Sequence, residues 1–166
     1  MKRKIKKKSD MGMSGRIRIV TRRAGTDEVL RRTPWFHNLI VSSDGYGRNL
    51  VAQLLAGVNA FTLNVTHGEM GTGTMPPSNG DTALAAPTVR GVRTQATVLN
   101  NVAQLQFFFS DAALPNNTYY EFGCFIDGTS TIGSGRLFER ALFGTPYAKN
   151  TGEDTTVELD LAITSL

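Results

Sequence analysis

The rest of the chain is organised around Phe61-Thr-Leu-Asn-Val-Thr66, which runs directly into His67-Gly-Glu-Met-Gly-Thr-Gly-Thr-Met-Pro-Pro-Ser-Asn-Gly-Asp-Thr-Ala-Leu84. Apolar and polar residues alternate over the first six positions, which predicts a half-buried strand over residues 61–66. The glycines that follow admit backbone angles closed to other residues, and Pro76-Pro77 stiffens the exit. The second part of the stretch therefore predicts a long loop from His67 to Asp81, which we expect to serve contact or shape rather than catalysis.

Length and composition indicate one folded domain. The chain has 166 residues, 40% of them hydrophobic, which is enough to build a core and too many for a disordered chain. No apolar run is long enough to cross a bilayer, and the basic N-terminus does not lead into the apolar stretch of a signal peptide. Cys124 is the only cysteine, so we predict a small buried core residue and no intrachain disulfide.

Charge divides the chain into a basic start and an acidic remainder. Residues 1–32 hold twelve basic and three acidic residues, whereas the remaining residues hold six basic and eleven acidic ones. We predict a flexible interaction arm over residues 1–15, whose partner is either nucleic acid or an acidic neighbouring subunit. The neighbour is slightly favoured, because the acidic body of each copy offers a surface to the arm of another. The predicted contact residues are Lys2, Arg3, Lys4, Lys6, Lys7 and Lys8.

The segments between the arm and the central stretch predict a hairpin and one helix. Residues 16–21 alternate apolar residues with arginines and are followed by a turn and a return strand at 29–32. Trp35 is interpreted as a core plug under this hairpin, with a stacking platform as the alternative. A helix is predicted near residues 44–57, capped by Ser43 or Asp44 and ended by Gly57. Its apolar stripe consists of Val51, Leu54, Leu55 and Val58.

The C-terminal half predicts strands throughout. Val98-Leu99 and Val102 flank an Asn-Asn pair that is typical of a hairpin turn, and apolar residues alternate with polar ones over 103–109 and 157–163. The fold class is therefore mainly β, an antiparallel β-sandwich of jelly-roll-like type with one short α-helix and an extended basic N-terminal arm. Residues 16–166 form its single domain.

Motifs for catalysis or cofactor binding are incomplete. His67 and Glu69 have the spacing of a zinc deaminase motif, but no cysteine pair follows to complete a metal site. The Gly71-Thr72-Gly73 run lacks the Gly-Lys-Ser/Thr of a phosphate loop, and Ser134 lacks the full nucleophile-elbow pattern. We therefore predict no enzyme, with no catalytic, cofactor-binding or metal-binding residues, no cofactor and no small-molecule substrate.

The order of the segments resembles a broad group of tailed-bacteriophage virion proteins from tails, baseplates and fibres. The resemblance covers about residues 38–166. It is carried by Asn38-Leu-Ile-Val41, Leu54-Leu-Ala-Gly57, Gly71-Thr-Gly-Thr74, Asp81-Thr-Ala-Leu84, Glu121-Phe-Gly123, Arg140-Ala141, Lys149 and Thr156-Val157. The His67–Met70 run and the basic arm depart from the pattern of that group.

The resemblance implies structural work in a virion. A repeated subunit of the tail, collar, baseplate or fibre attachment region is expected, made in the host cytoplasm and assembled with copies of itself and neighbouring virion proteins. A capsid decoration or head-attached protein is the first alternative, and a nucleic-acid-binding module acting through the arm is the second. No membrane partner is expected.

Overall fold

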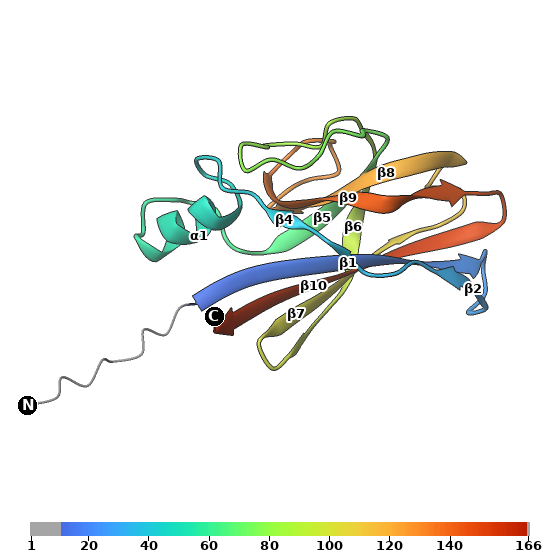
Figure 1. Ribbon diagram of the computed structural model, residues 1–166, viewed down its shortest axis with the longest axis horizontal. Helices are drawn as coiled ribbons and strands as arrows, with labels where there is room; N and C mark the ends of the chain where they lie inside the picture. The colour runs from blue at the N-terminus through green and yellow to red at the C-terminus, as the bar shows by residue number, and fades with distance from the viewer. Residues whose placement is uncertain (1–10, 166) are drawn as a thin grey trace, which may run out of the picture.

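Over the part of the chain that the structure describes, ten antiparallel strands form one continuous sheet that curls into a half-barrel, with a single helix at one end (Figure 1). The structure is a computed structural model and describes residues 11–165. The elements are β1 (Met11–Arg23), β2 (Val29–Arg32), β3 (Phe36–His37), β4 (Leu39–Ile40), α1 (Gly47–Leu55), β5 (Val65–Gly71), β6 (Pro87–Leu99), β7 (Val102–Phe109), β8 (Asn117–Ile126), β9 (Arg136–Lys149) and β10 (Glu153–Ser165).

Strand β6 is where the sheet turns from its first half (β2-β1-β10-β7) into its second half (β5-β8-β9-β4). The strand order is β2-β1-β10-β7-β6-β5-β8-β9-β4. Residues 87–92 of β6 pair with β5, whereas residues 93–99 pair with β7. At the turning point Gly91 lies against the ring of Phe109, where an added Cβ would come within 2.7 Å of a ring carbon. The predicted mainly antiparallel β fold with one helix is confirmed. The finer prediction of a jelly-roll-like sandwich is not, because the strands form one curled sheet.

Residues 36–40, hereafter the seam, bridge the two halves of the sheet on the side opposite β6. Phe36 and His37 pair with β1, and Leu39 and Ile40 pair with β9. Between them, the backbone N–H of Asn38 donates to the carbonyl of Gly15. The seam therefore connects the two halves of the sheet through backbone hydrogen bonds and holds them together on this side.

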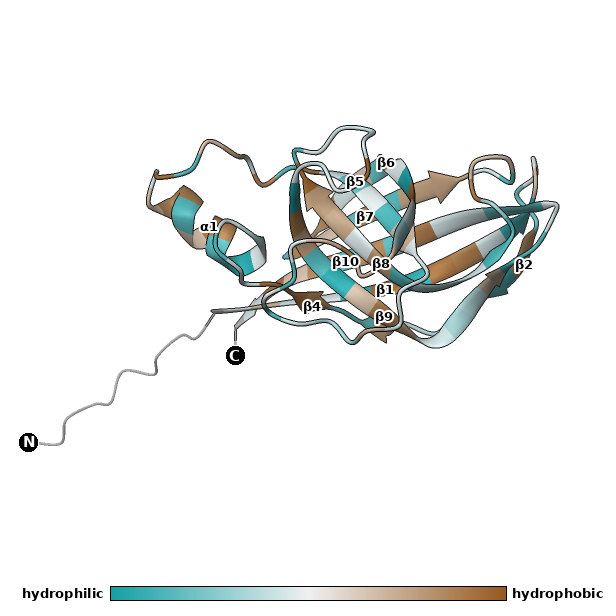
Figure 2. Ribbon diagram, turned by 90° about the horizontal axis from the view of Figure 1, so that it is seen from above, coloured by the Kyte–Doolittle hydropathy of each residue, from teal (hydrophilic) through white to brown (hydrophobic). Residues whose placement is uncertain are grey.

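The core fills the space between the two halves of the sheet, as the alternation of apolar residues predicts. Ile17 and Ile19 of β1 are fully buried and lie between arginines that point outward, and the rings of Phe107 and Phe122 pack across the interior with centroids 5.3 Å apart. Figure 2 shows hydrophobic and hydrophilic residues following one another along the strands. Other core residues are Leu105, Phe109, Cys124, Ile126, Phe138, Val157 and Leu159, which confirms the prediction for Cys124.

Both predicted hairpins are present. Residues 20–22 of β1 pair with β2 through a turn that contains Gly25, whose φ is +70°. Strands β6 and β7 join at Asn100 and Asn101, and Asn100 has the positive φ of 53° that the Asn-Asn pair predicts.

The helix is shorter than predicted and starts differently. α1 covers Gly47–Leu55 rather than residues 44–57, and its N-cap is Tyr46, which makes no side-chain capping hydrogen bond. The Ser43 and Asp44 prediction is therefore wrong, since residues 43–46 form a turn closed by a hydrogen bond from the Tyr46 N–H to the Ser43 carbonyl. Gly57 does end the helix, with φ of +69°.

The predicted apolar stripe of the helix is only partly inward. Leu50 is the fully buried helix residue, and Val51 and Leu54 pack on the core. Leu55 and Val58 are 82% and 73% exposed. The inward stripe consists of Gly47, Leu50, Val51 and Leu54, one helical turn earlier than predicted, because the short helix contacts the sheet with its first turns and leaves its C-terminal end in solvent.

The central strand begins later than predicted. β5 covers Val65–Gly71, so His67–Gly71 belong to a strand, and residues 61–64 precede it. Gly68 misled the sequence interpretation. An added Cβ there would lie 2.6 Å from the ring of Phe122, so glycine is required by a close packing contact and not by a loop. The loop of the stretch is residues 72–86, hereafter the cover loop.

The start of the domain and the role of Trp35 also differ from the predictions. β1 begins at Met11 and pairs with β10 from that residue, so residues 11–15 of the predicted arm lie in a strand. Trp35 is half-buried on the outer side of the sheet, where the guanidinium carbons of Arg16 and Arg18 lie 4.3 Å and 4.6 Å from its ring centroid. The core-plug interpretation is wrong, and the stacking alternative describes the contact.

Candidate binding cleft at the open end of the half-barrel

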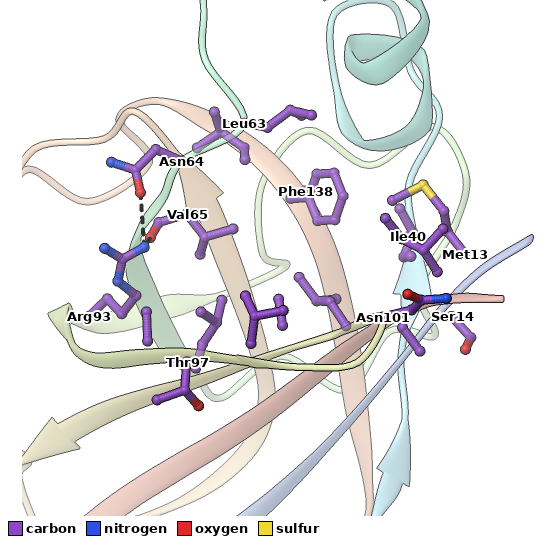
Figure 3. A pocket seen from close by; sticks show the side chains of 18 of the residues that line it. Met13, Ser14, Ile40, Leu63, Asn64, Val65, Arg93, Thr97, Asn101 and Phe138 are labelled. Carbon is purple, nitrogen blue, oxygen red and sulfur yellow. Dashed lines mark hydrogen bonds between the residues drawn. The ribbon is translucent and has the colours of Figure 1, made fainter.

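A cavity opens at the end of the half-barrel that carries α1 (Figure 3). Its volume is about 750 Å³, and it lies between the β6–β7 hairpin, the first residues of β1, the end of β10 and residues 63–65. Its floor is apolar. Lining side chains include Met13, Ile40, Leu105, Phe138 and Leu161.

The polar groups of the cleft lie at its rim. Arg93 donates from Nη1 to Oδ1 of Asn64 over 2.9 Å and to the carbonyl of Val65 over 2.7 Å. Figure 3 shows this pair on one side of the cleft and Asn101 and Ser14 on the other. All residues that line the cleft are apolar, neutral polar or arginine, so the described wall holds no carboxylate.

Exposed apolar side chains surround the mouth of the cleft. Val98, Leu63 and Ile163 line it and are 76%, 49% and 47% exposed. Leu99 at the same hairpin is also exposed, and α1 at this end carries the exposed Leu55. Exposed apolar side chains that gather around one opening are typical of interaction sites.

Strand β1 presents an open edge beside the cleft. Its whole length pairs with β10 on one side, whereas on the other side β3 pairs with residues 16 and 17 and β2 with residues 20–22. Among the described residues, no strand pairs with residues 11–14 on that side. The carbonyls of Gly15 and Ile19 point to this side, so by the two-residue period the N–H and carbonyl of Met13 do so as well.

The cover loop is fixed on the outer face of β8 by a buried ionic cluster. Glu121 is fully buried, accepts the N–H groups of Gly73, Ala85 and Ala86, and pairs with Nε of Arg140 at 2.8 Å. Arg140 in turn binds Asp81 and the carbonyl of Met75, both in the cover loop. Leu84 packs with Phe125 and Leu137 beneath the loop. These contacts give the loop one defined path.

A second buried pair fixes the loop of residues 127–135. Glu69 and Arg90 form an ion pair in which both side chains are almost fully buried. Glu69 also accepts the N–H of Gly133, and Arg90 donates to the carbonyls of Thr129 and Ser134. Burial, with a smaller effect of Arg90, lowers the pKa of the neighbouring His67. Glu69 is thus a structural anchor for this loop.

A third buried carboxyl has no partner. Glu139 lies inside the half-barrel, opposite Cys124 on β8 and Ile40 on β4 in the strand register. Among residues 11–165, both of its oxygens and both polar atoms of the Asn38 side chain in the seam lack a hydrogen-bond partner. Burial raises the pKa of Glu139 to about 8, against smaller opposing effects of Asn38 and Cys124. The same burial raises the pKa of Cys124, so this thiol is not a reactive one.

The predicted arm residues Lys2, Arg3, Lys4, Lys6, Lys7 and Lys8 lie outside the described residues. The arm leads into Met11, close to the cleft wall at Met13 and Ser14. Within residues 11–165, most carboxylates are already paired with cations. Those outside ion pairs are Asp27, Asp44, Asp127, Glu139 and Asp154. The acidic surface that the body offers is therefore much smaller than its net charge suggests.

Sequence reasoning missed the cleft residues. Arg93 and Asn64 lie far apart in the sequence and meet only because β5 and β6 are neighbours. One local signal was available, namely the apolar pair Val98-Leu99 directly before a hairpin turn, where polar residues are usual.

No known protein family, curated protein or solved structure matches this chain. Among the described residues, no three His, Cys, Asp or Glu side chains gather where they could hold one metal ion, and no helix is long and apolar enough to cross a membrane.

Proposed function

We propose that this protein is a non-enzymatic structural component of a tailed-bacteriophage virion, assembled as a repeated subunit of the tail, collar, baseplate or fibre attachment region. The proposal starts from the order of segments in the sequence. The observation in the structure that supports it most is the apolar cleft with its exposed apolar mouth, which is a surface suited to a protein neighbour. We propose further that the two halves of the sheet act as the two layers of a jelly-roll-like sandwich.

The fixed loops support a scaffolding role. The Glu121–Arg140 and Glu69–Arg90 pairs are buried and hold two long loops on the same half of the sheet. Buried ion pairs are weak sources of stability, but they specify one geometry, since leaving either partner alone is costly. A surface that must fit a neighbour in a repeating assembly needs such a defined shape, so we assign the cover loop to subunit contact.

The arm has two candidate partners, and the distribution of acids changes their balance. Attraction between the arm of one copy and the body of another was favoured by the acidic remainder of the chain. Because most of those acids are paired internally, we now favour a different anionic partner, either another virion protein or packaged DNA. A capsid decoration or head-attached protein remains the alternative function, since a DNA-facing arm suits it. A module that acts only by binding nucleic acid through the arm is the second alternative.

The function is tested by locating the protein in particles. Antibodies raised against the purified protein should label one defined site on purified virions in negative-stain microscopy, and mass spectrometry of those virions should find the protein at a fixed copy number. Its absence from washed particles would overturn the proposal. Detection at the tail would exclude the decoration alternative, and detection on the capsid shell would select it.

The arm is tested separately by its salt dependence. If it contacts DNA, binding should be independent of base sequence and should fall with salt at a log–log slope of roughly −0.9 per phosphate contact. Deleting residues 2–8 should abolish it. If the arm instead contacts a protein neighbour, the deletion should lower incorporation into DNA-free particles, and normal incorporation there would exclude the neighbour.

A further inference from the structure

The second half of strand β6 has an open backbone edge. Residues 93–99 pair with β7 on one side, whereas β5 begins at Val65 and pairs with residues 87–92. Among residues 11–165, no strand pairs with residues 94–99 on the side away from β7. Residues 94–99 are also all exposed, which is the longest exposed run in any described strand. The end of β6 therefore extends past the neighbouring strand that covers its first half.

The hairpin turn determines which backbone groups face this edge. Leu99 and Val102 lie opposite each other across the turn of Asn100 and Asn101, and in such a hairpin the flanking residues exchange hydrogen bonds. Alternation along the strand then directs the N–H and carbonyl groups of Ala96 and Val98 away from β7. No other segment of the described chain supplies a backbone partner for them. The edge therefore presents donors and acceptors in a row.

This edge lacks the features that keep strand edges from pairing. Charged residues, prolines and bulges commonly protect exposed edges, and an unprotected edge is a template for another strand. Residues 94–110 contain no charged residue and no proline, and the pairing with β7 is regular from residue 95 to 99. By contrast, the edge strand β2 carries Arg31 and Arg32, and the exposed part of β9 contains Pro146. The open edge of β6 is therefore suited to accept a strand.

A second copy of the same edge is the partner that fits it best. When two antiparallel copies of β6 meet with Thr97 on the two-fold axis, Ala96 of each copy lies opposite Val98 of the other. The outward donors and acceptors of both residues then find partners in each other. Because the edge carries no charge, two identical edges meet without like-charge repulsion. Such a pairing also uses both open edges at once, so it closes at two copies.

The same pairing covers exposed apolar side chains. Ala96 and Val98 line the cleft, whereas Figure 3 shows the Thr97 side chain on the opposite side of the strand from Leu63. Val98 and Leu99 are 76% and 61% exposed. A strand added at this edge brings its own alanine and valine onto the cleft side, next to these residues. Apolar contact therefore adds to the backbone hydrogen bonds.

We infer that two copies of this protein associate through residues 94–99 of β6 and form a symmetric dimer with an antiparallel strand pair centred on Thr97. The sheets of the two copies are then joined into one. The inference rests on the proposed assembly role, for which it names the surface through which two copies meet.

Substitutions at Thr97 test the partner and the register together. The two copies of this residue face each other at the axis, so Thr97→Lys and Thr97→Glu should each weaken dimerisation at least about tenfold in sedimentation velocity at micromolar concentrations. A mixture of the two variants should dimerise again, because opposite charges then face each other. The control Gln104→Lys adds a charge to the same outer face but on β7, away from the edge, and should dimerise like the unchanged protein.

The backbone pairing is tested with Val98→Pro and Val98→Ala. Both variants shorten the apolar side chain, but only proline removes the N–H that faces the edge, and this N–H does not bond to β7. Each copy contributes one such N–H, so the dissociation constant should be about ten- to hundredfold higher for the proline variant than for the alanine variant.

A cross-link tests the register directly. Opposed residues of a non-hydrogen-bonded antiparallel pair have Cα atoms about 4.5 Å apart, which a disulfide can span. On oxidation Thr97→Cys should therefore form a covalent dimer, whereas Gln104→Cys should not. The native Cys124 is buried and does not compete.

Several outcomes would overturn the inference. These are a monomer at all micromolar concentrations, a dimer that persists in both Thr97→Lys and Thr97→Glu, and a mixture of these variants that stays monomeric. The Thr97 variants decide the question if Val98→Pro does not fold. A Thr97→Cys protein that cross-links to a different virion protein, and not to itself, would assign the edge to that protein instead.

The inference and the proposed function can fail separately. A monomer with normal labelling of virions would leave the proposed function intact. A dimer that is absent from virions would overturn only the proposed function.

Discussion

Replacing Glu139 by glutamine should change how stability depends on pH. The side chain is fully buried between Cys124 of β8 and Asn38 of the seam, and its oxygens have no hydrogen-bond partner. Burial raises its pKa from 4.5 to about 8. The folded protein therefore holds this proton between about pH 4.5 and 8, while the unfolded chain has released it.

The sign and size of the effect follow from linkage. A raised pKa gives stability that is fully present below pH 4.5 and is lost as the pH rises through 8. In that window the free energy of unfolding should fall by about 1.4 kcal/mol per pH unit, and by about 5 kcal/mol in total. Glutamine cannot ionise, so the Glu139→Gln variant should lack this slope. The variant starts with a cost of about 1–3 kcal/mol for an unpaired buried amide, and it should become the more stable protein toward pH 8.

Urea unfolding measures this directly. Trp35 is the only tryptophan and adjoins the seam, so its fluorescence reports unfolding near Glu139. Measurements from pH 5 to 8 stay below the ordinary pKa of the Cys124 thiol, whose own raised pKa would add a loss at higher pH. The lowered pKa of His67 acts in the opposite direction but is common to both proteins. Parallel pH profiles for the two proteins would refute the assignment of a buried, protonated carboxyl.

Three further substitutions have expected outcomes. Glu121→Ala should lower the free energy of unfolding by about 3–5 kcal/mol, because it leaves the buried Arg140 without this carboxylate. Hydrogen exchange should then increase across the cover loop. Unchanged exchange there would contradict the anchoring role. Glu69→Ala should lower the free energy of unfolding by a similar amount. His67 is half-buried and forms no ion pair with the described residues, so His67→Ala should lower it by under about 1 kcal/mol. Equal losses of stability in urea unfolding would show that Glu69 is not an anchor. Gly68→Ala should destabilise by about 1–3 kcal/mol through overpacking, whereas the control Gly144→Ala, whose Cβ would meet Phe36 at an ordinary 3.6 Å, should be nearly neutral in thermal unfolding.

Local patterns predicted the strands and turns that are set by neighbouring residues. The alternation of Ile17 and Ile19 with arginines, and the Asn100-Asn101 turn, need only the chain itself to be interpreted, because side-chain direction and turn geometry are local properties. The burial of Cys124 followed from the same alternation.

Residues whose environment comes from distant segments were interpreted wrongly. Gly68 was assigned to a loop, although a ring from β8 requires its missing side chain. Trp35 was assigned to the core, although two arginines of β1 hold it on the outer face. In both cases the deciding neighbour lies far away in the sequence, so no local pattern could show it.

The mainly β fold, its helix and the concentration of positive charge at the N-terminus follow from the order of the residues alone, because composition and periodicity act over a few residues. Three features exist only in the folded chain: most acids of the body are used in internal ion pairs, Glu139 is buried outside any ion pair among the described residues, and an apolar cleft opens beside the start of β1. These features depend on which strands become neighbours when the sheet curls at β6, and that pairing is a property of the whole chain.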